Sequence, residues 1–96
     1  MLNRDLARFL IAAKTFLYNE KLKNPDINIY DHEVPREEVV CIAKMSESEA
    51  EEAAKNLQNA GMIHMFVCDD KFGSCKVASL AFDKLDEFLT NYRGKP

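Results

Sequence analysis

The sequence predicts one small α+β domain, mostly helical, with a two- or three-stranded antiparallel sheet. Helical apolar spacing recurs near the start, in the middle and at the end of the chain. Over residues 62–82 the apolar period changes to two, which is typical of a β-hairpin. A chain of 96 residues can bury one modest core. We therefore expect a single domain, 1–96, with an N-terminal helix (1–22), a helix-turn-helix (35–61), a hairpin (62–82) and a C-terminal helix (83–93).

The N-terminal helix has the clearest pattern. Its apolar residues fall at i, i+4, i+7, i+8, i+11, i+14 and i+15, and they are Leu2, Leu6, Phe9, Leu10, Ala13, Phe16 and Leu17. Asn3 is a suitable N-cap, and Asp5 lies where the helix dipole favours a carboxylate. Because Asn24-Pro25 disfavours further helix, we expect the helix to end at about residues 18–22.

Two shorter helices follow at 36–44 and 47–60. Val34 is expected to form a strand of one or two residues, and Pro35 suits the first position of the second helix. Ser46 and Glu49 have the spacing of a capping box and so open the third helix. Gly61 can adopt the positive φ that ends it.

The hairpin is expected to have strands at 63–68 and 75–81, joined by a polar loop of six residues at 69–74. Asp83 is then expected to cap the last helix. The apolar face of that helix follows at i, i+3, i+4 and i+7, as Leu85, Phe88, Leu89 and Tyr92.

This order of elements resembles the winged helix-turn-helix regulators, especially the small MarR-like and PadR-like proteins. Met45-Ser46 is similar to their Leu-Ser pair, and residues 57–63 are similar to their Leu-Glu-x-x-Gly-Leu-Ile phrase. The Thr that often follows the wing is missing from residues 80–83. The resemblance covers about residues 33–90. It implies a DNA-binding regulator of transcription whose third helix enters the major groove.

Helical spacing with Ala50, Ala54 and Leu57 inward points Ser48, Glu52, Lys55 and Asn59 outward, with Glu51 and Asn56 beside them. The candidate contacts with double-stranded DNA are four polar residues of the third helix, two lysines of the hairpin and two further cations. They are Ser48, Lys55, Asn56, Asn59, Lys71, Lys76, Arg36 and Lys44.

The charge of the chain opposes simple DNA binding. The net charge is −3, and residues 46–60 contain four acids and one base. Acids near a helix N-terminus also stabilise the helix, which accounts for Glu47 and Glu49. Glu51 and Glu52 would repel phosphates unless the cations converge on one face. The alternative is a protein-interaction module whose acidic third helix binds a basic partner and no DNA.

The three cysteines are an odd number, which favours reduced thiols. In a symmetric hairpin Cys68 and Cys75 would face each other at disulfide distance, as a redox pair or, with His64, part of a zinc site. Their six-residue spacing is not that of a structural zinc site, so ordinary strand cysteines are the preferred reading. Cys41 is expected in the core. No catalytic set, cofactor or metal is predicted, and an enzyme is not expected.

The N-terminal helix carries apolar residues beyond its main stripe, and the last helix adds Phe88 and Tyr92. These residues predict a homodimer interface of Ala7, Ile11, Tyr18, Phe88 and Tyr92. The alternative is that both helices wrap a single core. The sequence shows no secretory signal and no apolar stretch long enough to span a membrane, so we expect a cytoplasmic protein with no membrane partner.

Overall fold

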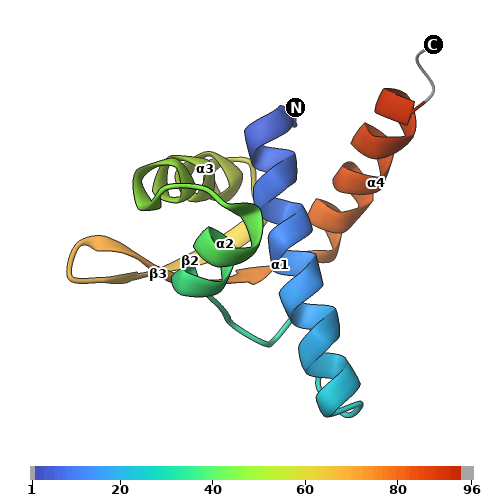
Figure 1. Cartoon of the computed structure of the whole chain (residues 1–96), viewed down its shortest axis with the longest axis horizontal. Helices are drawn as coiled ribbons and strands as arrows, with labels where there is room; N and C mark the ends of the chain where they lie inside the picture. Colours follow the sequence, from blue (N-terminus) through green and yellow to red (C-terminus); the bar gives the residue numbers. More distant parts are fainter. Residues whose placement is uncertain (1, 94–96) are drawn as a thin grey trace.

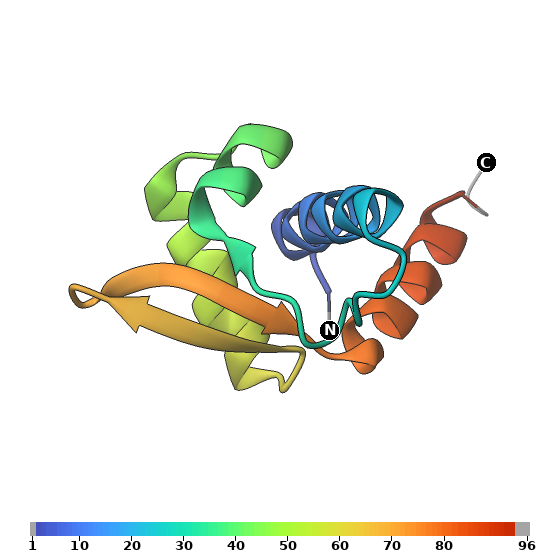
Figure 2. The same cartoon turned by 90° about the horizontal axis from the view of Figure 1, so that it is seen from below.

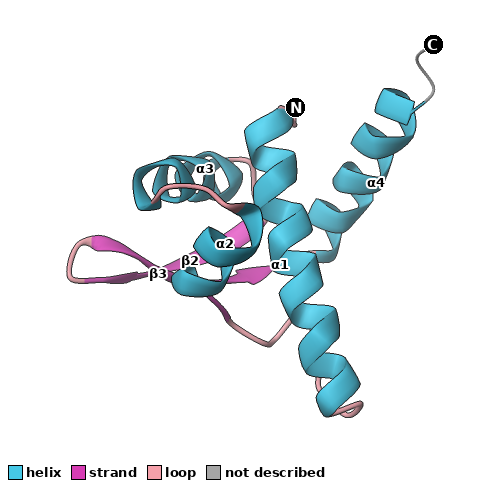
Figure 3. Ribbon diagram, viewed as in Figure 1, coloured by secondary structure: helices cyan, strands magenta, loops and turns pink. Residues whose placement is uncertain are grey.

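A computed structural model describes residues 2–93 and confirms the α+β class, with helices forming most of the chain (Figure 1; Figure 3). The sheet is antiparallel, with strand order β1-β3-β2. The elements are α1 (Arg4–Lys23), β1 (Val34–Pro35), α2 (Arg36–Ala43), α3 (Glu47–Asn59), β2 (Ile63–Cys68), β3 (Lys71–Val77) and α4 (Ser79–Arg93).

α1 runs through the centre of the molecule. α2, α3 and the hairpin β2–β3 lie on one side of it, and α4 lies on the other (Figure 1; Figure 2). The buried face of α1 includes Phe9, Leu10 and Leu17, which have no exposed surface. The hairpin projects from the body of the domain, and its far end is the part most distant from α4 (Figure 2).

Both ends of α1 are capped by residues next to the helix, and the N-cap is the residue that the sequence predicted. The Leu6 N–H donates to Oδ1 of Asn3 at 2.9 Å, so Asn3 is the N-cap. At the other end the Asn24 N–H donates to the Glu20 carbonyl at 2.9 Å. The helix ends at Lys23, slightly later than expected.

The α2–α3 unit also follows the predicted signals. Ser46 and Glu49 form both bonds of the capping box, at 3.0 and 2.9 Å, and Gly61 has a φ of +76°. Pro35 is the N-cap of α2 and not its first helical residue, because it extends the chain to pair with Ser74 of β3. Lys44 ends α2 in the left-handed region, with φ +56°.

The hairpin differs from the prediction. β3 begins at Lys71, so the connection is only Asp69 and Asp70, with φ of +54° and +64°. Gly73 lies where the register shifts and has no partner in β2, as in a β-bulge. The reason for the earlier start of β3 is Phe72, which is 1% exposed and packs against Phe9 at 5.7 Å between ring centroids.

The last helix also begins earlier than expected. Asp83 lies inside α4, which starts at Ser79. The strand ladder ends where the Ala78 N–H donates to the Met62 carbonyl at 3.0 Å. Ala81 and Leu85 are then buried at helical spacing against α1. This burial favours a helix from residue 79 onwards, although the sequence pattern there is that of a strand. Within residues 2–93, no helix combines the length and apolar character needed to cross a membrane.

Candidate functional site

α3 exposes one polar edge. Ala50, Ala54 and Leu57 are fully buried, and four residues on the opposite side of the helix are exposed to solvent. These four residues are Ser48, Glu52, Lys55 and Asn59, as helical spacing predicted, and we call them the α3 edge.

Two adjoining grooves run beside the α3 edge. The first, of about 470 Å³, lies between α3, the start of α2 and the start of β3; it is lined by Arg36, Glu47, Ser48, Glu51, Glu52, Lys55 and Lys71. The second, of about 710 Å³, shares Arg36, Glu47 and Lys71 and continues over the hairpin to Phe66 and Ser74. The shared residues make one continuous hollow from the α3 edge to the hairpin.

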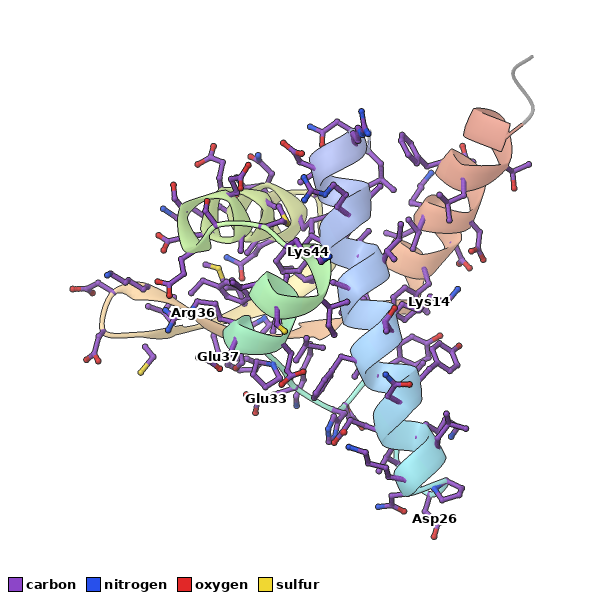
Figure 4. The ribbon with its side chains drawn as sticks, viewed as in Figure 1. Lys14, Asp26, Glu33, Arg36, Glu37 and Lys44 are labelled. Carbon is purple, nitrogen blue, oxygen red and sulfur yellow. The ribbon has the colours of Figure 1, made fainter. Side chains whose placement is uncertain are left out.

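Three of the predicted cations converge on the first groove, each from a different element. Arg36 is held at the start of α2, where a guanidinium N–H donates to the Phe72 carbonyl at 3.4 Å and another nitrogen lies 3.5 Å from Glu37 (Figure 4). Lys55 comes from α3 and pairs with Glu51 at 3.3 Å. Lys71 is the exposed first residue of β3. The tertiary structure thus gathers positive charge that is scattered in the sequence.

The other predicted contacts lie elsewhere. Lys44 is at the opposite end of α2 from Arg36, next to α1 (Figure 4). Its carbonyl and that of Ala43 accept from the Arg8 guanidinium at 3.3 and 2.8 Å. Asn56 faces a separate groove of about 440 Å³ between α3 and the start of α1. Lys76 is nearer the base of the hairpin, with its Nζ 5.9 Å from the Phe66 ring centroid.

The acids of α3 are only partly available. The carboxylate of Glu49 accepts the Ser46 N–H, and this bond, with that to the Ser46 hydroxyl, holds the pKa of Glu49 below its usual range. Glu51 is paired with Lys55. Among the described residues, no ion pair is formed by Glu47 or Glu52. These two carboxylates therefore set the acidic character of the groove.

The expected facing of Cys68 and Cys75 is wrong. The register places Cys75 opposite Met65 and Cys68 opposite Lys71, because the turn is two residues long. Cys75 is buried, and this burial, with the nearby Glu33 carboxylate, raises the pKa of its thiol to about 12. Cys68 is exposed, so the two thiols do not share an environment.

Cys41 is exposed and not in the core, because the buried side of α2 is centred on Val39. All three cysteines are free thiols. Within residues 2–93, no group of three or more His, Cys, Asp and Glu side chains could hold a metal ion.

The predicted dimer residues are not equally accessible. Ile11 and Tyr18 are 41% and 45% exposed on α1. Ala7 is 3% exposed in the core and has almost no surface to offer a partner, because it faces inward with Leu6 and Leu10. Phe88 is half-buried against the core, and the side chain of Tyr92 lies outside the described residues. Leu22, 81% exposed, was missed; it lies eleven residues after Ile11, on the same helical face.

Comparison with known proteins adds no assignment. No protein family matches the sequence, and no curated protein or solved structure is significantly similar to it.

Proposed function

We propose that this chain is a winged-helix protein that binds double-stranded DNA and regulates transcription, with α3 entering the major groove. The observation that carries the proposal is the convergence of Arg36, Lys55 and Lys71 beside the α3 edge. Three cations from three elements would neutralise phosphates along one side of an inserted helix.

The arrangement of the elements supports this function. A short helix, a turn and a second helix followed by a hairpin is an arrangement that presents the second helix to a groove of DNA. The major groove, about 12 Å wide, admits an α-helix. Ser48 and Asn59 of the α3 edge are exposed and can exchange hydrogen bonds with base edges, and asparagine suits adenine.

The charge balance is better than the sequence suggested. Of the four acids of α3, Glu49 accepts hydrogen bonds within the capping box, and the other three, Glu47, Glu51 and Glu52, line the first groove. Arg36, Lys55 and Lys71 line the same groove, so its three acids are matched by three bases. This leaves a modest barrier to phosphate approach, and we expect specific binding to weaken steeply with salt.

The test is fluorescence anisotropy with labelled mixed-sequence duplexes over a range of salt concentrations. Lys55→Gln and Lys71→Gln should each weaken binding and reduce the slope of log affinity against log salt by about one. Lys84→Gln is the matched control, because Lys84 is an exposed lysine of α4, paired with Glu87 at 3.9 Å and remote from the grooves. Equal slopes for all three variants would refute the proposal.

A second candidate function rests on the acids of the same groove. Glu47, Glu51 and Glu52 line it, and such a surface fits a basic protein partner better than DNA. Replacing Glu51 and Glu52 with Gln separates the two functions. The change should tighten DNA binding if phosphates approach this groove. If neither the parent nor the double variant binds any duplex at low salt, the protein-interaction function replaces the DNA-binding one.

We also propose that the protein acts as a cytoplasmic homodimer. The support is the exposed apolar surface of Ile11, Tyr18 and Leu22 along one face of α1, which a second copy would bury. Free thiols, two of them exposed, fit a reducing compartment. The alternative is a monomer in which both terminal helices serve one core.

A further inference from the structure

The last carbonyls of α2 are held by a cation from α1. Nη2 of Arg8 donates to the Ala43 carbonyl at 2.8 Å and to the Lys44 carbonyl at 3.3 Å, although Arg8 precedes Ala43 by 35 residues. α2 has no basic residue in its own last turn. Because a cation stabilises the negative end of a helix dipole, Arg8 supplies a charge that α2 lacks.

The turn that Arg8 holds has an unusual backbone. Lys44 has a φ of +56° and a ψ of +46°, in the left-handed region that residues with a Cβ rarely adopt. Glycine takes this conformation freely, whereas lysine takes it where surrounding contacts fix it. The bond from Arg8 to the Lys44 carbonyl is such a contact, and Met45 beside it is buried. The turn between α2 and α3 therefore depends on α1 as well as on its own sequence.

The packing of α3 offers little resistance to tilting. Its buried residues are three alanines and one leucine, namely Ala50, Ala53, Ala54 and Leu57. A methyl group makes fewer contacts than a longer side chain, so alanines bring helices close together without interlocking them. Near the N-terminal end of α3, the groove of about 440 Å³ lies between α3 and the start of α1. The turn held by Arg8 ties α3 to α1 at this same end.

Arg8 does not belong to the surface proposed to meet DNA. It lines neither of the two grooves beside the α3 edge. Its Nη1 lies 3.7 Å from the Asp5 carboxylate on α1. Bonds from Ser46 are the main reason that the pKa of Glu49 is low, and the Arg8 charge adds to them. Arg8 therefore acts on α1, on the turn and on the first turn of α3 together.

We propose that Arg8 is a positioning residue, which fixes the angle of α3 against α1 and so holds the α3 edge in the orientation that enters the major groove. It acts through the carbonyls of Ala43 and Lys44 and makes no contact with DNA. When the binding-competent orientation is less populated, the measured affinity falls by the same factor. This inference rests on the proposed DNA-binding function and adds a determinant of affinity outside the DNA surface.

The experiment measures duplex affinity against salt for variants that are first shown to be folded by circular dichroism. Arg8→Gln should weaken affinity by about tenfold, which corresponds to the loss of one hydrogen bond from a charged group. The salt slope should not change, because no phosphate contact is lost. Arg8→Lys keeps the charge on a shorter side chain without the guanidinium fork, and its affinity should lie between those of the parent and Arg8→Gln.

Two controls separate positioning from charge and from stability. Arg4→Gln removes the same charge from the same helix, and the exposed Arg4 side chain forms no hydrogen bond or ion pair among the described residues. Leu89→Ala lowers stability through a half-buried side chain of α4 that packs against the core. Both controls should bind duplex as the parent does.

Amide hydrogen exchange tests the same positioning without DNA. The Glu49 and Ala50 N–H groups donate to the Ser46 hydroxyl and carbonyl at 3.0 and 2.9 Å, at the start of α3. Their exchange should become faster in Arg8→Gln and stay unchanged in Arg4→Gln, because only Arg8 holds the preceding turn. Equal exchange in the two variants would overturn the inference.

The outcomes also separate this inference from the function on which it rests. A parent protein that binds no duplex overturns both. A parent that binds, with Arg8→Gln no weaker than Arg4→Gln or Leu89→Ala, overturns only the positioning role. A salt slope reduced by about one in Arg8→Gln would make Arg8 a phosphate contact, and that result would overturn the positioning role while supporting DNA binding.

Discussion

Replacing Phe72 with Ala should remove a large part of the stability of this domain. Phe72 is 1% exposed, and its ring packs against Phe9 at 5.7 Å, joining the hairpin to α1. Deleting a buried Phe side chain costs about 3–5 kcal/mol, through lost apolar burial and the cavity that remains. Domains of this size are stable by about 5–15 kcal/mol, so the change should leave a marginally folded protein.

The assay is urea unfolding followed by circular dichroism. With a denaturant dependence of about 2 kcal/mol per molar, a loss of 3–5 kcal/mol lowers the midpoint by about 1.5–2.5 M. Val67→Ala is the matched control, because Val67 is the cross-strand partner of Phe72 but is 59% exposed. That variant should lose less than about 1 kcal/mol. Equal losses for the two variants, or a negligible loss for Phe72→Ala, would refute the placement of Phe72 inside the core.

Three further predictions follow from other parts of the fold. Burial raises the pKa of the Cys75 thiol to about 12 in the folded protein, against an ordinary 9.0 in the unfolded chain. Because the unfolded chain ionises first as the pH rises, the free energy of unfolding should fall by about 1.4 kcal/mol per pH unit between those two pH values. Cys75→Ala should remove that part of the alkaline loss in pH-dependent unfolding; an unchanged profile contradicts the burial. Ser46→Ala should cost about 1 kcal/mol in urea unfolding, because it breaks the capping box, and no loss would contradict the cap. Changing Ile11 and Tyr18 together to Glu should give a folded monomer by light scattering, whereas a monomeric parent would end the dimer proposal.

The sequence determined the helical framework because the signals that start and stop a helix are local. Asn3 caps α1, Ser46 and Glu49 form their capping box, and Gly61 takes positive φ, each within a few residues of the helix end it controls. The outward side of α3 also followed from helical spacing alone, since exposure alternates with the turn of the helix. Local chemistry was sufficient for these features.

The start of β3 and of α4 required the tertiary structure. The segment 69–74 reads as a polar loop, yet packing of Phe72 on Phe9, far away in the sequence, makes most of it strand. Residues 79–82 continue the alternating side-chain pattern of a strand, but they form the start of α4 because Ala81 and Phe82 are buried in the core. Local propensity is weak where a distant apolar surface decides which side chains are buried.

The same distinction applies to the candidate site. The sequence identified Arg36, Lys55 and Lys71 as possible contacts, but not that they line one groove while Lys44 and Lys76 lie apart from it. The local sequence alone determines which residue is present and on which side of its helix it lies. Whether charges from α2, α3 and β3 meet depends on how those elements pack around α1 and on a two-residue turn, and only the folded chain fixes that arrangement.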